Sequence, residues 1–210
     1  MSKIQRFSKH DVRELSTQPL YNGYFKMVQY QFQHRLYNGG WSETVTREIF
    51  ERGHAVAVLP YDPILKEFVL IEQVRIGALP TTETPWLIEI IAGIIDPGEK
   101  PADVCVREAQ EEAGIDIQHL TEAVSYLASP GGTTERLSIY MAQVDATKAT
   151  GVHGLDYESE DILVHRVSEE KARLWLDDGT IDNAAAIIAL QWFFIHKASL
   201  LEQWQTSNYR

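Results

Sequence analysis

The sequence predicts an α+β fold built as a mixed-sheet sandwich, preceded by a small antiparallel β-sheet. Segments with strand and helix patterns follow one another without the regular alternation that a doubly wound sheet requires. Two strand-like segments joined by a glycine turn occupy the N-terminus. The 210 residues suit one large domain or a domain with a small appendage. We therefore expect an N-terminal β-sheet region over residues 1–50 and a larger domain over residues 51–210.

The N-terminal region is expected to contribute two strands. Residues 1–20 are polar, and we expect them to be loosely ordered. Residues 24–35 alternate between apolar side chains and glutamines, which is typical of a half-buried strand. The Asn-Gly-Gly turn at 38–40 predicts a hairpin, and residues 41–50, which are rich in Thr and Val, return as the second strand.

The larger domain contains six further segments with strand patterns. Each is apolar, and the first two flank a turn at Asp62-Pro63. These segments are 54–59, 68–74, 86–92, 123–128, 137–144 and 162–167.

Three helices are expected among these strands. Pro101 suits the first turn of a helix and Gly114 suits the position just past its end. Ser168 is a reasonable N-cap for a second helix that runs to Asp178. Residues 182–183 open the last helix, which is apolar enough to be largely buried.

Composition excludes several classes of protein. The chain has 30 acidic and 19 basic residues and a net charge of −11, which disfavours nucleic acid as a partner because phosphate affinity requires Lys and Arg. The single cysteine, Cys105, permits no internal disulfide and is expected in the core. The N-terminus has no apolar signal region, and the apolar tract 184–195 is too short to span a bilayer. We therefore expect a soluble, cytoplasmic protein that has no membrane partner.

Four glutamates, Glu99, Glu108, Glu111 and Glu112, cluster around Arg107. A helix places positions i, i+3 and i+4 on neighbouring faces, so the last three carboxylates project together, and each close pair destabilises a helix by about 0.2–0.5 kcal/mol. Such a cluster indicates a bound cation, and Mg²⁺ prefers carboxylate oxygens shared with substrate phosphates. The plain alternative is an acidic run on a solvated helix.

The position of these carboxylates on the helix favours the cation. An apolar stripe runs at helical spacing along the same segment. Its members are Ala102, Cys105, Val106, Ala109 and Ala113. Glu108 and Glu112 lie beside this stripe, at 100° per residue, so we expect them at the edge of the core.

The segment 93–115 resembles the Nudix box, G-x5-E-x7-R-E-U-x-E-E-x-G-U, where U is an apolar residue. All nine specified positions are in register, with Ala109 small for a U position. They are Gly93, Glu99, Arg107, Glu108, Ala109, Glu111, Glu112, Gly114 and Ile115. The resemblance to Nudix hydrolases implies an α/β/α sandwich with a loop-helix-loop that holds divalent metal against a diphosphate. It also implies hydrolysis of a nucleoside diphosphate linked to another moiety.

The flanking sequence resembles the ADP-ribose pyrophosphatase branch of that family. Pro130 follows Ile115 by fifteen residues, a spacing that marks this branch. Other stretches with the same likeness are 47–55, 71–78, 83–99, 154–168 and 181–193. The resemblance implies hydrolysis of ADP-ribose to AMP and ribose 5-phosphate. Two alternatives remain: action on another nucleoside diphosphate sugar, or a ligand sensor without turnover, although no box carboxylate is lost here.

The first-choice metal ligands are Glu108 and Glu112, which are box glutamates one helical turn apart. The expected ion is Mg²⁺, with Mn²⁺ as the alternative, and two or more ions could share the site. The resemblance adds the carbonyl of Ala92. Glu99 and Glu111 are weaker candidates and could instead pair with Arg107, whose expected role is to tie down the loop.

A second acidic stretch, residues 156–161, reads on its own as a solvated loop. In the resembling enzymes the corresponding loop delivers the catalytic base and a further ligand, which match Glu158 and Glu160. Glu111 and Glu135 are the next candidates for the base.

Substrate contacts require cations and flat surfaces. Guanidinium groups grip phosphate in bidentate fashion, which makes Arg47, Arg75 and Arg136 candidates. By resemblance Tyr24 could stack on adenine, and Glu135 could hold a ribose hydroxyl or a water. The resemblance also implies that the N-terminal sheet helps to form a homodimer and reaches the partner's active site.

Overall fold

The structure is a computed structural model that describes residues 6–155, 157 and 159–207. It divides into two compact units, and each is described by itself. The first comprises Met1–His54 and Leu127–Arg136, and the second comprises Ala55–Tyr126 and Leu137–Arg210.

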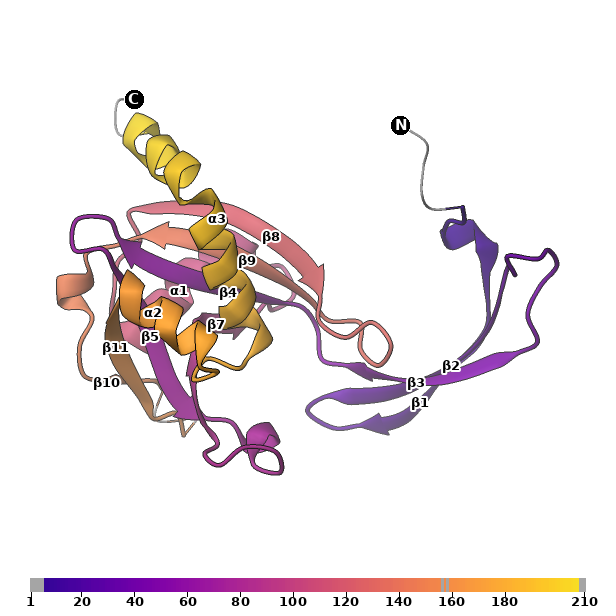
Figure 1. Cartoon of the computed structure of the whole chain (residues 1–210). Coiled ribbons are helices and arrows are strands. Elements are labelled where there is room, and N and C mark those ends of the chain that lie inside the picture. Colours follow the sequence, from indigo (N-terminus) through magenta and orange to yellow (C-terminus); the bar gives the residue numbers. More distant parts are fainter. Residues whose placement is uncertain (1–5, 156, 158, 208–210) are drawn as a thin grey trace. The chain divides into compact units, whose positions relative to one another are not determined.

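The first unit contains a three-stranded antiparallel sheet, visible at the indigo end of the chain in Figure 1. Its strands are β1 (Val12–Asn22), β2 (Lys26–His34) and β3 (Val45–Glu51), in the order β1-β2-β3. The turn before β3 uses Gly39 and Gly40 at φ of 94° and 80°, the left-handed region that glycine favours. The expected loose order is wrong for β1, because backbone pairing with β2 satisfies its polar groups although its side chains are exposed.

The sheet of the first unit has no core of its own. None of the described residues 6–54 is buried. Large apolar side chains instead remain exposed on it, among them Leu15 at 51%, Leu20 at 44% and Tyr24 at 88%. A small sheet with an open apolar surface requires another surface to cover it.

The second unit is an eight-stranded mixed sheet with helices on both faces. Its strands are β4 (Ala55–Asp62), β5 (Glu67–Val74), β6 (Trp86–Glu89), β7 (Ile91–Ile94), β8 (His119–Leu127), β9 (Arg136–Gln143), β10 (Val152–His153) and β11 (Ile162–Ser168). The path is β10-β11-β5-β4-β9-β8, with β6 paired to β5 and β7 paired to β4. The sheet is mixed because β4 runs parallel to β9 and antiparallel to β7.

Three helices complete the sandwich: α1 (Pro101–Ala113), α2 (Glu169–Asp177) and α3 (Ala184–Ser207). Alternate residues of β4 enter opposite cores: Val56 and Val58 pack with α1, whereas Ala57 and Leu59 pack with α2 and α3. The expected mixed-sheet sandwich is confirmed. The segment 86–92 forms parts of two strands rather than one, because β6 and β7 pair with different partners.

Helix α1 begins and ends where the sequence predicts. Pro101 occupies its first turn, and Gly114 caps its C-terminus at φ of 62°. Cys105 and Ala109 are fully buried, as expected, but Val106 is 47% exposed whereas Val104 is fully buried. The buried face is therefore rotated away from Val106, towards Val104 and Glu112.

Helix α3 is longer than the apolar tract at its start. Residues 184–206 have a mean hydropathy of 1.5, so by length and composition this one helix among the described residues could cross a membrane. The helix runs past the expected tract 184–195, because Gln191 is exposed and does not interrupt it, while Leu200 and Trp204 continue its buried side. A core helix has the same composition, and α3 supplies Phe193 to the second core.

Candidate active site

Two glutamates of α1 meet the backbone of β7 at the edge of the first core. Glu112 is only 3% exposed, and its Oε2 accepts a hydrogen bond of 3.0 Å from the Ala92 N–H. Glu108 lies against Gly93, where an added Cβ would stand 1.8 Å from Glu108 Oε1. Any side chain at residue 93 would displace this carboxylate, so the glycine of the box is required by the close approach of helix and strand.

Both carboxyl groups titrate far from their ordinary range. Burial raises the pKa of Glu112 to about 8; the Ala92 N–H opposes the shift and the charge of Glu108 adds to it. Burial also raises the pKa of Glu108 to about 7, against the effect of Arg107. Two adjacent acids that resist ionisation are stabilised as carboxylates by a nearby cation.

Arg107 gathers three of the four box glutamates. Its Nη1 donates to Glu108 Oε1 at 2.8 Å and to Glu111 Oε2 at 2.9 Å, and its Nε lies 3.5 Å from Glu99 Oε1. Glu99 also accepts from the Asp96 N–H at 2.9 Å, which closes the loop before α1. In this structure Glu99 and Glu111 therefore pair with Arg107 and hold the loop against the helix.

The segment that leads into the acidic stretch is bonded to the C-terminal part of α1. The Gly154 N–H donates to the Glu111 carbonyl at 3.1 Å, and Glu160 Oε2 accepts from the Leu155 N–H at 3.3 Å. The charge of Glu160 contributes to raising the pKa of both Glu108 and Glu112. Glu158, the expected base, lies outside the described residues.

Arg75 follows β5 and interacts electrostatically with Glu112. Its charge lowers the pKa of Glu112, and its Nε donates to Glu89 Oε2 at 2.9 Å. The sequence interpretation missed Glu89 and its second partner, Gln73. The available signal was a polar residue in line with apolar ones: Gln73 two residues after Ile71, and Glu89 within an apolar run.

The other expected substrate-binding residues belong to the first unit. Tyr24 is 88% exposed and makes an edge contact of 4.6 Å with Phe25. Arg47 is exposed, and its Nη1 donates to the Thr46 carbonyl. Glu135 is 8% exposed and lies 3.2 Å from Arg52 Nε, so this carboxylate already has a cationic neighbour that the sequence did not reveal. Arg136 is exposed at the end of the same loop.

The residues around Ala92 fit a hard divalent cation. Two carboxylates one helical turn apart, a backbone carbonyl and water form the ligand set that Mg²⁺ uses beside substrate phosphates. No group of three or more His, Cys, Asp or Glu side chains within the described residues is arranged to hold a metal ion. A cation held by Glu108 and Glu112 would therefore depend on water, substrate and backbone oxygens for its remaining ligands.

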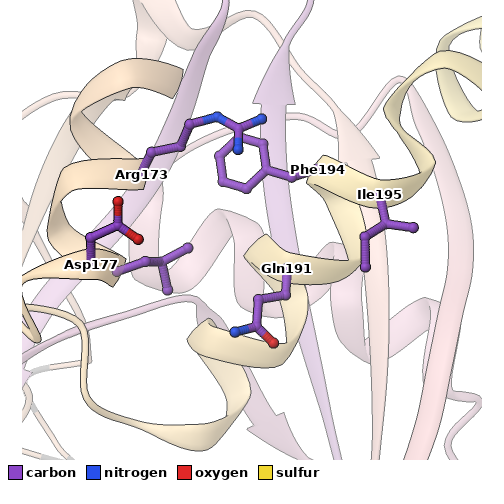
Figure 2. Close-up of a pocket in the computed structure, with 6 residues that line it drawn as sticks. Arg173, Asp177, Gln191, Phe194 and Ile195 are labelled. Atoms are coloured by element: carbon purple, nitrogen blue, oxygen red, sulfur yellow. The ribbon is translucent and has the colours of Figure 1, made fainter.

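A surface pocket of about 340 Å³ lies elsewhere, between α2 and α3. Figure 2 shows Arg173 over the ring of Phe194, at 3.6 Å from its centroid, with Asp177 and Gln191 on the walls. This pocket is on the face of the sheet opposite α1 and contains a single acid. The clustered carboxylates on α1 are the better candidate for chemistry.

A family model described as NUDIX domain matches residues 51–209, and this range includes the box helix and all but the last residue of the second unit of the fold. The chain belongs to the Nudix family.

Relatives of known name extend the likeness to the N-terminal sheet. The ADP-ribose pyrophosphatase of Escherichia coli (strain K12) is 54% identical over 198 residues, which cover 94% of this chain and 95% of that protein. The ADP-ribose pyrophosphatase of Haemophilus influenzae is 47% identical over 210 residues, covering 99% and 97%. A solved structure described as ADP compounds hydrolase shares the fold, with a TM-score of 0.68 and 20% identity over 97% of this chain and 99% of that chain.

Proposed function

We propose that this protein hydrolyses the diphosphate of ADP-ribose to AMP and ribose 5-phosphate, with Mg²⁺ or Mn²⁺ as the cofactor. The choice of ADP-ribose as the substrate is supported by the 54% identity with an ADP-ribose pyrophosphatase over 94% of the chain. The pair of buried carboxylates on α1 supports the reaction class, since hydrolysis of a diphosphate requires cationic charge beside its oxygens.

Glu108, Glu112 and the Ala92 carbonyl would hold the cation, and Glu160 would complete the set. The bound ion would neutralise phosphate oxygens and lower the pKa of the attacking water. Arg107 keeps the box glutamates together, and Arg75 presents a guanidinium to the diphosphate. Tyr24, Arg47 and Glu135 are proposed to bind the remaining parts of the substrate.

Glu158 is the proposed general base. It would take a proton from water as the water oxygen forms a bond to one phosphorus, while the bridging P–O bond breaks. The leaving phosphate keeps the bridging oxygen and its electron pair. An acidic loop suits this role because the ligand carboxylates are engaged elsewhere. Glu111 and Glu135 are the next candidates.

A substrate panel tests the proposal against another nucleoside diphosphate sugar as the substrate. We expect kcat/KM for ADP-ribose to exceed that for GDP-mannose, UDP-glucose and ADP-glucose by at least about tenfold, which corresponds to about 1.4 kcal/mol of differential transition-state binding. A higher kcat/KM for one of the other sugars would overturn the choice of substrate. Binding of ADP-ribose without cleavage at any metal concentration would favour a ligand sensor.

We also propose a symmetric homodimer in the bacterial cytoplasm. The three-stranded sheet exposes Leu15 and Leu20 and has no buried residue among residues 6–54, so a second copy would supply the missing cover. The net charge of −11 disfavours nucleic acid as a partner.

A further inference from the structure

Three polar side chains meet along the antiparallel strands β5 and β6, on the sheet face that α1 covers. Ile71 pairs with Glu89 and Gln73 pairs with Leu87 across the two strands. Residues opposite one another share a face, and so do residues two apart, so Gln73 and Glu89 are diagonal neighbours beside Ile71. Ile71 packs in the α1 core, which fixes the face on which both polar groups lie.

One carboxylate oxygen joins these side chains. Glu89 Oε2 accepts from Arg75 Nε at 2.9 Å and from Gln73 Nε2 at 3.2 Å. Gln73 is 6% exposed and the Glu89 side chain is 14% exposed, so both are held by their surroundings. The bond to Arg75 uses only the inner nitrogen of the guanidinium. Among the residues that the structure describes, neither terminal nitrogen of Arg75 has a hydrogen-bond partner.

The orientation of the guanidinium follows from this contact. The group is planar, so a bond at Nε fixes the plane and the direction in which both terminal nitrogens point. A free arginine side chain loses much rotational entropy when it grips a ligand, and an oriented one loses less. Ile71 packs in the α1 core and Arg75 follows it at a same-face position, so the oriented group leaves β5 on the side of the sheet that holds the α1 carboxylates.

The contact is not required to hold the hairpin. The Arg75 N–H donates to the Pro85 carbonyl at 2.8 Å, and β5 pairs with β6 through four residue pairs. A buried carboxylate is costly in an apolar core unless it is paired. Burial raises the pKa of Glu89 and the charge of Arg75 opposes that shift, so the acid is retained at an energetic cost that the strand pairing does not explain.

We propose that Glu89, held by Gln73, is a positioning residue that orients Arg75 so that its two terminal nitrogens grip the substrate diphosphate. This inference rests on the proposed function, in that a diphosphate occupies the site. Glu89 touches no reacting atom and acts through Arg75. Its removal is therefore expected to weaken phosphate binding while sparing the chemical step.

A double-mutant cycle on ADP binding separates this role from a structural one. The probe is ADP with Mg²⁺, measured by titration calorimetry. We expect Arg75→Ala and Glu89→Leu each to weaken binding about tenfold, the effect of losing an oriented charge-assisted hydrogen bond. Glu89→Leu added to Arg75→Ala should change the affinity by less than about twofold, because the residue has nothing left to orient.

Three further measurements sharpen the test. Glu89→Gln retains a carbonyl acceptor and should recover part of the affinity lost in Glu89→Leu. With substrate, Glu89→Leu should raise KM about tenfold and change kcat by less than about threefold. The matched control is Glu72→Gln. Glu72 precedes Gln73 in β5 and points to the opposite face of the sheet, where its Oε2 lies 2.7 Å from His165 Nε2. This control should leave ADP affinity within about twofold of the wild type.

Additive losses in the cycle, or unchanged ADP affinity in Glu89→Leu, would overturn the inference. Absence of ADP binding by the wild type would overturn it as well. The substrate panel reports separately on the proposed function. If the wild type binds ADP but prefers another nucleotide sugar, ADP-ribose is not its substrate. The double-mutant cycle on ADP binding still decides the role of Glu89 in that case.

Discussion

Glu112→Gln and Glu108→Gln are each expected to reduce kcat by about three orders of magnitude. Each change removes one charged ligand of a cation that lowers the activation free energy by several kcal/mol. A loss of about 1.36 kcal/mol corresponds to a tenfold lower rate. The measurement is the steady-state rate with ADP-ribose at limiting and saturating Mg²⁺. The matched control is Asp103→Asn, which removes an exposed carboxylate from the same helix and should leave kcat within about twofold. Near-normal rates in both glutamine variants would refute the metal-site assignment.

Glu112→Gln is expected to lower activity, but to reduce the loss of stability with rising pH when the metal is chelated. The pKa of Glu112 is about 8 in the folded state and has the ordinary value of 4.5 in the unfolded chain. Between these two pH values the folded state keeps the proton that the unfolded chain has lost. The folded state then binds more protons, so its stability falls as pH rises from about 4.5 to 8. In EDTA the melting temperature of the wild type should decline across this window, and that of Glu112→Gln should decline by a few degrees less. An equal decline in both proteins would contradict the burial argument.

Deletion of residues 1–50 is expected to give an inactive monomer. The deletion removes β1, β2 and most of β3, and with them Tyr24 and Arg47. It also removes the support of the glycine-rich loop, since the Phe50 N–H donates to the Gly132 carbonyl at 2.8 Å. Light scattering gives the mass of the particle, and the ADP-ribose assay gives its activity. A fully active monomer would refute the role of the sheet.

A milder change guards against misfolding of the deletion variant. Leu15→Glu combined with Leu20→Glu places charges on two exposed apolar positions of β1 and should dissociate the dimer without changing the melting of the second unit. Gln18→Glu, on the same strand and exposed, is the control and should remain dimeric. Dimers that persist in the double variant would show that the interface lies on another surface.

Much of the fold was predictable because its signals are local. Helix α1 runs between Pro101 and Gly114 as expected, and Ser168 caps α2 by accepting from the Lys171 N–H. The strand β1 was not predictable, because its stability comes from pairing with β2 and not from its side chains. The buried face of α1 was misjudged for a related reason: Val104 is buried by the sheet beneath it, which no helical wheel contains.

In the candidate site, too, the residues placed by local sequence spacing were predictable, and the contacts set by tertiary packing were not. The box fixes the spacing of Glu108 and Glu112, so a helix brings both to one edge of the core. The contact of Arg75 with Glu89 depends on which residues of β5 and β6 lie opposite one another, and that register is set by tertiary packing. The ion pair of Glu135 with Arg52 joins segments about 80 residues apart and has no local signal.

Product analysis on ADP-ribose decides whether the protein is a metal-dependent ADP-ribose hydrolase. The full chain is incubated with ADP-ribose and Mg²⁺, with and without excess EDTA, and the products are separated by ion-exchange chromatography. We expect AMP and ribose 5-phosphate in equal amounts, with their formation abolished by the chelator. ADP-ribose that remains intact in the presence of Mg²⁺ or Mn²⁺, or equal turnover in EDTA, would contradict it.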